Sequence, residues 1–181
     1  MHQEIILAGT GGQGIQSAGQ VLAQVALEQG LDVSEVSQYS PEVRGGWVLS
    51  TVVVSDRRVG SPIVQMADCL LLMSQRAADD NKGRVRPGGL VLVNSSLVEL
   101  PPIPEARVVA VPATEMAVEL GVQQIANMVM LGAYCKCAGT LDIVYFDQAL
   151  QTVLPERHHR HIPLNLQAVQ AGVEVVIASG E

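Results

Sequence analysis

The first twenty residues, MHQEIILAGTGGQGIQSAGQ (residues 1–20), join an apolar run to a glycine-rich turn. Residues 3–8, QEIILA, are short and apolar, which is typical of a buried parallel strand. The turn that follows has the spacing G-x-G-x-x-G, formed by Gly9, Gly11 and Gly14. This spacing occurs where a chain leaves a strand, turns tightly past a phosphate and enters a helix.

The next residues complete a unit of strand, helix and strand. Apolar side chains follow helical spacing in residues 15–29, and Gly30 is a natural stop for that helix. Residues 31–38, LDVSEVSQ, predict a second strand. Together these segments predict a βαβ unit with a right-handed crossover.

The remainder of the chain predicts further strands and helices. Residues 47–60 contain the strand-like WVLSTVVVS followed by a turn signal, and we interpret them as a hairpin-like excursion. Further strands are predicted at residues 68–73, 90–94 and 106–111, and helices at 75–84, 114–120, 123–138, 142–154 and 163–178. The pattern predicts an α/β fold: one three-layer, Rossmann-like domain over residues 1–181, with a mainly parallel sheet and a helical C-terminal end.

Composition narrows the classes of function. The net charge is −7 and aromatic residues make up 3%, so the chain lacks the positive field and stacking platforms of a nucleic-acid binder. Hydrophobic residues make up 48% and charged residues 16%, which indicates that part of the surface is covered by a partner. No apolar run reaches the roughly 18 residues of a membrane span, and no signal-peptide pattern is visible. We therefore expect a cytoplasmic protein with no membrane partner.

Whether the turn binds NAD depends on an acidic residue at the end of the second strand, roughly 20 residues further on. Glu35 lies inside that strand, but its expected end at Ser37 and Gln38 carries no acid. The missing acid disfavours NAD. Two interpretations remain: the helix N-terminus holds some other anion, or the glycines serve only close packing of helix on strand. The combined strand and helix context favours an anion.

A second candidate segment is the loop at residues 39–46, YSPEVRGG. It follows the second strand, so we expect it at the same carboxyl edge of the sheet as the glycine turn, where open α/β sheets bind ligands. The loop combines Glu42, Arg44, Gly45 and Gly46. Taken alone, it is most simply an exposed turn with a local Glu–Arg pair.

Taken together, the segments are far more specific. GTGGQGI, YSPEVRGG, SPI with ADCL, VPATEMAVELG, NMVMLGA and NLQAVQAG follow in order, and this series resembles the gamma subunit of the 2-oxoacid:ferredoxin oxidoreductases. The resemblance extends from Ile5 to about Gly172. In that family the loop reads Tyr-Gly-Pro-Glu-x-Arg-Gly-Gly, and Ser40 stands here in place of the first glycine. The form Pro-Glu-Val-Arg-Gly-Gly is most similar to the 2-oxoglutarate branch, with the pyruvate, branched-chain and aryl branches still open.

The resemblance implies a subunit that is inactive alone. Such enzymes oxidatively decarboxylate a 2-oxoacid, transfer the acyl group to coenzyme A and pass electrons to ferredoxin. Thiamine diphosphate and iron–sulfur clusters are carried by other subunits or domains, so this chain is expected to bind no cofactor by itself. The implied partners are alpha and beta subunits and a ferredoxin-type delta subunit or ferredoxin. The gamma subunit is expected to supply no catalytic residue but to help form the coenzyme A side of the active site.

The candidate binding residues lie in three segments of the chain. They are Gly9, Gly11, Gly12, Gln13, Gly14, Pro41, Glu42, Arg44, Gly45, Gly46 and Asn127. Two other classes of function stay open at this point. One is a self-sufficient NAD- or flavin-binding Rossmann-type oxidoreductase, and the other is a scaffold subunit without ligand contact.

No metal site is expected. Cys69, Cys135 and Cys137 are one thiolate short of a cubane cluster. On the predicted helix the last two point about 200° apart, so they cannot chelate one metal, and Cys135 is expected in the core. His158, His159 and His161 form a histidine cluster, for which a solvated loop is favoured over a metal site.

Overall fold

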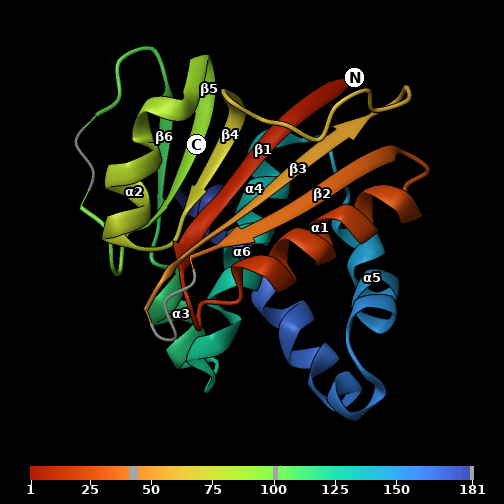
Figure 1. The fold of residues 1–181 in the computed structure, drawn as a ribbon. Helices are drawn as coiled ribbons and strands as arrows, with labels where there is room; N and C mark the ends of the chain where they lie inside the picture. Colours follow the sequence, from red (N-terminus) through yellow and green to blue (C-terminus); the bar gives the residue numbers. More distant parts are fainter. Residues whose placement is uncertain (41–44, 100–101, 180–181) are drawn as a thin grey trace.

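The sheet has six strands in the part of the chain that the structure describes (Figure 1). The structure is a computed structural model and describes residues 1–40, 45–99 and 102–179. The strands are β1 (His2–Thr10), β2 (Asp32–Tyr39), β3 (Trp47–Ser55), β4 (Ala67–Leu72), β5 (Val85–Asn94) and β6 (Arg107–Val111). Their order across the sheet is β2-β3-β1-β4-β5-β6. Only β3 runs antiparallel to its neighbours, so the predicted, mainly parallel sheet is confirmed.

The helices cover the two faces of the sheet unequally. They are α1 (Ile15–Glu28), α2 (Gln75–Asn81), α3 (Ala113–Glu119), α4 (Ala126–Ala138), α5 (Phe146–Val153) and α6 (Ile162–Ser179). The short 3₁₀ turns are η1 (Lys82–Arg84), η2 (Gln123–Ile125), η3 (Ile143–Tyr145) and η4 (Glu156–His161). In Figure 1, α2 lies apart from the group formed by α1, α4, α5 and α6.

Two apolar cores follow from the alternation of side chains along β1. Ile5 and Leu7 pack into the larger core with side chains of α1 and α3 to α6. Ile6 and Ala8 face the other way and pack with α2. All four side chains are at most 2% exposed. β1 is therefore buried on both faces, and the predicted three-layer arrangement is confirmed.

The prediction for residues 47–60 is wrong. We expected a hairpin-like excursion, but Trp47–Ser55 is one long strand inside the sheet. It pairs along its whole length with β1 on one side, and from Val48 to Ser55 with β2 on the other. The run Val52, Val53 and Val54 is buried because both faces of β3 are covered.

The C-terminal helices pack through glycine. A Cβ atom added to Gly132 on α4 would lie 1.9 Å from the carbonyl oxygen of Val169, and one added to Gly172 on α6 would lie 2.0 Å from that of Val129. Each helix therefore presents a glycine to the backbone of the other. The two glycines therefore allow α4 and α6 to pack backbone against backbone.

No helix among residues 1–40, 45–99 and 102–179 is long and apolar enough to cross a membrane.

Candidate functional site

The candidate site lies at the carboxyl ends of two neighbouring strands, β1 and β4. The connections that follow these strands lead to opposite sides of the sheet. From β1 the chain passes through α1 to β2, on one side of the sheet, whereas from β4 it passes through α2 to β5, on the other side. α1 and α2 also pack against different faces. β1 and β4 are hydrogen-bonded neighbours, so their carboxyl ends form the crevice in which open α/β sheets bind ligands.

The glycine turn connects the end of β1 to the start of α1 (Figure 1). Gly12 has φ 95° and Gly14 has φ 67°, values in the left-handed region that side-chain-bearing residues rarely adopt. A Cβ added to Gly9 would lie 2.7 Å from Cδ1 of Ile15 and 2.6 Å from Oε1 of Gln13. Conformation thus explains the glycine at position 14 and packing the glycine at position 9, whereas neither requires one at position 11.

Two of the turn's own N–H groups are used inside the protein. Gly11 N–H donates to the carbonyl oxygen of Gly46 at 2.9 Å, and Gln13 N–H donates to that of Thr10 at 3.2 Å. In the described residues, no acceptor is recorded for the N–H groups of Gly12 or Gly14, nor for those of residues 15–17 at the start of α1. An anion at the turn would meet those groups, rather than the N–H of Gly11.

Gln13 ties the turn to the end of β4. Its Oε1 accepts hydrogen bonds from the N–H of Thr10 at 2.8 Å and from the Thr10 hydroxyl at 3.2 Å. Its Nε2 donates to the carbonyl oxygen of Met73 at 2.8 Å. Met73 N–H in turn donates to the Ala8 carbonyl oxygen at 2.9 Å. The Gln13 carboxamide is therefore committed to contacts within the chain.

Asn127 ties the turn to α4. It is 7% exposed, and its Nδ2 donates to the carbonyl oxygen of Gly14 at 3.0 Å. Its Oδ1 accepts from the N–H of Met128 at 2.9 Å. The sequence singled out Asn127 only through the family resemblance, and the structure brings it against the glycine turn.

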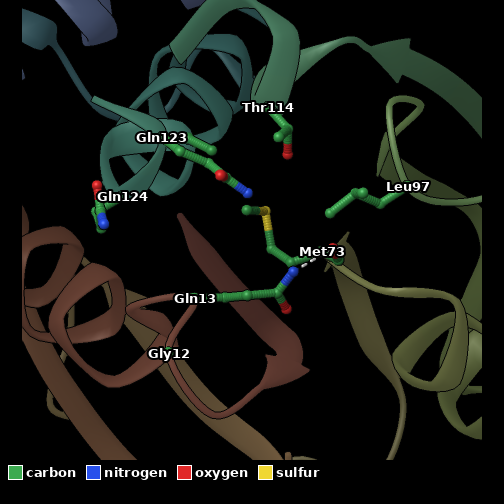
Figure 2. Close-up of a pocket in the computed structure, with 8 residues that line it drawn as sticks. Gly12, Gln13, Met73, Leu97, Thr114, Gln123 and Gln124 are labelled. Carbon is green, nitrogen blue, oxygen red and sulfur yellow. Dashed lines mark hydrogen bonds between the residues drawn. The ribbon is translucent and has the colours of Figure 1, made fainter. Parts of the chain in front are cut away.

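A pocket of about 200 Å³ opens beside the turn, and Figure 2 shows the side chains around it. Its lining residues lie within a few residues of the carboxyl ends of four strands, in η2, or at the start of α4: Gly12, Gln13, Met73, Leu97, Thr114, Gln123, Gln124 and Ala126. Among these lining residues there is no charged side chain. The sequence analysis missed Met73 as a site residue, although it is the last residue of a predicted strand and lies at the edge where ligands are expected.

The hydroxyl of Thr114 is held at the pocket by a buried partner. Asn94, at the end of β5, is fully buried and donates from Nδ2 to Oγ1 of Thr114 at 2.8 Å. Asn94 Oδ1 also accepts from the Thr114 N–H at 3.3 Å. Because its oxygen already accepts this bond, the Thr114 hydroxyl can donate its own proton into the pocket, toward which it points in Figure 2.

The candidate loop reaches the turn through its glycines. Of its five candidate binding residues, Gly45 (φ 68°) and Gly46 are described. Pro41, Glu42 and Arg44 lie outside the described residues. Ser40 N–H donates to the carbonyl oxygen of Trp47 at 3.0 Å, where the two flanking strands meet. Ser40 is absent from the described positions with positive φ, so its backbone does not require the family's glycine.

Two aromatic side chains flank the same loop. Tyr39 is 70% exposed and Trp47 is 38% exposed. In contrast, Tyr134 and Phe146 are fully buried. The two exposed aromatic side chains thus lie at the two ends of the candidate loop.

Glu35 is placed where it cannot serve a nucleotide ribose. It lies in the middle of β2, and its Oε1 accepts hydrogen bonds from the hydroxyls of Ser37 and Ser50, both at 2.6 Å. In addition, β3 separates β2 from β1. The end of β2 is therefore two strand spacings, roughly 10 Å, from β1, and Glu35 is not available to bind a nucleotide ribose there.

The cysteines and histidines do not gather at this edge. Cys135 is buried in α4, and burial raises its pKa to about 12. Cys69 is buried in β4, and desolvation raises the pKa of its thiol well above the usual range. His158 and His161 lie in η4, with His159 against the Leu154 carbonyl oxygen at 2.8 Å. Among the described residues there is no group of three or more His, Cys, Asp or Glu that could hold a metal ion.

The fold and this crevice define an α/β protein of the open-sheet class, with a glycine turn at the switch point. A sequence model of the family described as "Pyruvate ferredoxin/flavodoxin oxidoreductase" matches residues 4–175. The chain therefore belongs to this family, as the resemblance predicted.

Relatives in this family are enzyme subunits. The 2-oxoglutarate synthase subunit KorC of Methanothermobacter marburgensis is 35% identical over 98% of this chain and 98% of that protein. The ketoisovalerate oxidoreductase subunit VorA of the same organism is 37% identical over 93% of this chain, which spans only 35% of VorA. The solved gamma subunit of a keto/oxoacid ferredoxin oxidoreductase from Geobacter sulfurreducens is 32% identical, with a TM-score of 0.81 over 97% of this chain and 99% of that one.

Proposed function

We propose that residues 1–181 act as one unit, the gamma subunit of a multi-subunit 2-oxoacid:ferredoxin oxidoreductase. The observation that carries the proposal is the match to KorC along nearly the whole of both chains. In VorA the matching unit is about a third of a longer polypeptide. A unit that occurs both as a separate chain and as part of a larger one is expected to work attached to the rest of its enzyme.

The proposed substrate is 2-oxoglutarate. Its support is the name of KorC, a 2-oxoglutarate synthase subunit similar over its full length, and the sequence of the loop at residues 39–46. The proposed reaction is oxidative decarboxylation to the acyl-coenzyme A, with electrons passed to ferredoxin. The proposed partners are alpha and beta subunits and a ferredoxin-type delta subunit or ferredoxin.

The chain's own contribution is proposed to be part of the coenzyme A side of the active site. The glycine turn suits a pyrophosphate, because a Cβ at Gly12 would meet nothing within 4 Å and the first N–H groups of α1 are available to an anion. Gly9 allows close packing at the start of this turn, and Gly14 adopts the left-handed backbone conformation at its end. The loop residues Pro41, Glu42, Arg44, Gly45 and Gly46 are proposed to contribute to binding the same ligand, and Asn127 to support the turn.

Thiamine diphosphate and iron–sulfur clusters are proposed to reside on the partner subunits. The three cysteines of this chain do not fit a cubane cluster, which takes four thiolates. Cys69 and Cys135 are buried in a strand and a helix, with their thiol pKa values raised, whereas cluster ligands must be thiolates.

The proposal is tested by reconstitution. The chain is co-expressed with its alpha, beta and delta subunits and passed over a size-exclusion column, and coenzyme A-dependent reduction of ferredoxin is measured with 2-oxoglutarate, pyruvate and 2-oxoisovalerate. We expect co-elution, and turnover that requires this chain and is fastest with 2-oxoglutarate. Elution of the chain by itself at micromolar concentration, with full turnover in its absence, would contradict the proposal.

A further inference from the structure

Two carboxamide side chains hold the two ends of the glycine turn. Gln13 binds Thr10 at the start of the turn and Met73 at the end of β4. Asn127 binds Gly14 at the end of the turn and belongs to α4. We propose that Gln13 and Asn127 are positioning residues that fix the N–H groups of Gly12 and of residues 14–17 for an anionic group of the substrate. This inference rests on the proposed function, in which that substrate is coenzyme A.

The bonds of Gln13 reach across the crevice. One oxygen accepts two hydrogen bonds from Thr10, and the nitrogen donates to Met73. These contacts join the loop after β1 to the loop after β4, the two strands whose ends define the site. Gln13 thereby sets the separation between the turn and the pocket wall, without needing to touch the ligand itself.

The bonds of Asn127 control the start of α1. The carbonyl oxygen of Gly14 accepts the first helical bond, from the Ala18 N–H at 2.9 Å, and also the bond from Asn127 Nδ2 at 3.0 Å. Gly14 has a left-handed backbone, and a Cβ there would lie 2.5 Å from Asn127 Nδ2. The side chain of Asn127 therefore occupies the space that any larger residue at position 14 would need.

Both positions require a side chain that donates and accepts at once. Each carboxamide accepts a backbone N–H through its oxygen and donates to a backbone carbonyl through its nitrogen. A carboxylate of the same shape can only accept. It would face the carbonyl oxygen of Met73 or Gly14 without a proton, and it would place a negative charge beside an anion site.

This requirement gives a test in Gln13→Glu and Asn127→Asp. A protonated carboxyl group has both a donor and an acceptor and can reproduce the native bonds, whereas the ionised group cannot. The described residues that line the pocket or bond to the two carboxamides carry no titratable side chain. A pH dependence that appears only in the variant therefore reports the introduced carboxyl group.

The first readout is independent of turnover. Amide signals of residues 10–17 are followed by NMR in the full chain between pH 5 and pH 8, with the native chain measured at each pH. We expect each variant to differ from the native chain at pH 8 and to approach it as the pH falls through the pKa of the new group. Signals that match the native chain at pH 8, or that are equally displaced at both pH values, would overturn the inference.

The second readout uses the assembled enzyme. We expect Gln13→Glu to raise the KM for coenzyme A roughly tenfold at pH 8, a factor that corresponds to about 1.4 kcal/mol, with a smaller change in kcat. Gln148→Glu, on the exposed surface of α5, is the matched control for the added charge. An unchanged KM for Gln13→Glu at pH 8 would overturn the inference. If Asn127→Asp does not fold, the half-buried Gln13 decides the outcome.

Failure of the proposed function gives a different pattern. If the turn does not meet coenzyme A, Gly11→Val also leaves the KM unchanged, while the NMR signals of Gln13→Glu still follow pH. If only the positioning role is wrong, Gly11→Val raises the KM and the carboxylate variants behave as the native enzyme.

Discussion

The N–H of Gly11 donates a 2.9 Å hydrogen bond to the carbonyl oxygen of Gly46. This bond joins the glycine turn after β1 to the loop between β2 and β3. The two segments that the sequence analysis singled out separately are therefore in direct contact, at the edge of the sheet where we expected both. The hydrogen bond between them is made by backbone atoms alone.

Gly11→Val tests whether the turn meets coenzyme A. Gly11 has no positive φ, and an added Cβ would be in ordinary contact at 3.9 Å from Gly45 N and Gly46 O. The chain is expected to fold, but the branched side chain would stand in the path of a phosphate. We expect the KM for coenzyme A to rise about tenfold or more, while thiamine-dependent decarboxylation persists.

The matched control for this change is Gly60→Val, where nothing lies within 4 Å of an added Cβ and φ is not positive. Equal coenzyme A kinetics in the two variants would argue against contact at the turn. Tight binding of NAD by the isolated chain in a calorimeter would argue for the dehydrogenase alternative instead.

Arg44→Lys tests the chemistry of the loop. A guanidinium binds carboxylate or phosphate through a planar fork that an ammonium group cannot copy. We expect lower turnover of the assembled enzyme, with the thermal stability of this chain unchanged within about 0.5 kcal/mol. Normal kinetics with an unchanged dependence on coenzyme A would show that the arginine is only a surface charge.

Gly132→Ala and Gly172→Ala test the packing of α4 on α6. In each case the new Cβ would overlap a backbone carbonyl oxygen at 2.0 Å or less, and neither backbone can move without separating the helices. We expect each substitution to lower the free energy of unfolding by about 3 kcal/mol, measured by urea denaturation. Gly83→Ala, with nothing within 4 Å, is the control and should change stability by less than about 1 kcal/mol.

The cysteines should differ in reactivity at pH 8. With a pKa of about 12, Cys135 is ionised in roughly one molecule in ten thousand at that pH, and the thiolate is the reactive form. Cys69 is fully buried with its pKa raised by desolvation, whereas Cys137 is half-buried. We expect iodoacetamide to label Cys137 first, as read by peptide mass spectrometry, and the other two only on unfolding.

The same shifts make stability depend on alkaline pH. Because the folded-state pKa of Cys135 lies above the ordinary value of 9.0, the unfolded chain loses this proton first. The stability from the buried thiol is complete below pH 9 and decreases as the pH rises toward 12. Urea midpoints that stay constant from pH 8 to pH 10.5 would contradict this expectation, and Cys135→Ala should weaken the dependence.

Local patterns in the sequence predicted most of the elements. The helix at residues 15–29 was found because its apolar spacing and Gly30 act locally, and the structure has α1 at Ile15–Glu28 with Gly30 in a left-handed conformation. The position of β3 in the sheet was missed because an apolar run such as Val52, Val53 and Val54 predicts a buried strand but not the strands with which it pairs. Pairing is decided by contacts between distant segments.

The sequence predicted the glycine turn of the site but not the side chains that hold it. Glycine spacing identified the turn, since conformation and close packing act within a few residues. Its attachments could not be predicted, because Gln13 bonds to Met73 and Asn127 bonds to Gly14 across long stretches of chain. A carboxamide has no periodic or spacing signal that would reveal such a partner.

The position of β3 between β1 and β2 also sets the order in which the chain can fold during translation. A nascent chain that ends before Trp47 contains two strands and a helix, but the two strands are not neighbours in the finished sheet. Because β1 takes its hydrogen bonds from β3 and β4, it has no partner until Ser55 has left the ribosome. The apolar face of α1 is likewise not fully buried until β3 has joined the sheet. The first third of this protein is therefore expected to remain open to chaperones and proteases while it is being made, and to close only when β3 inserts.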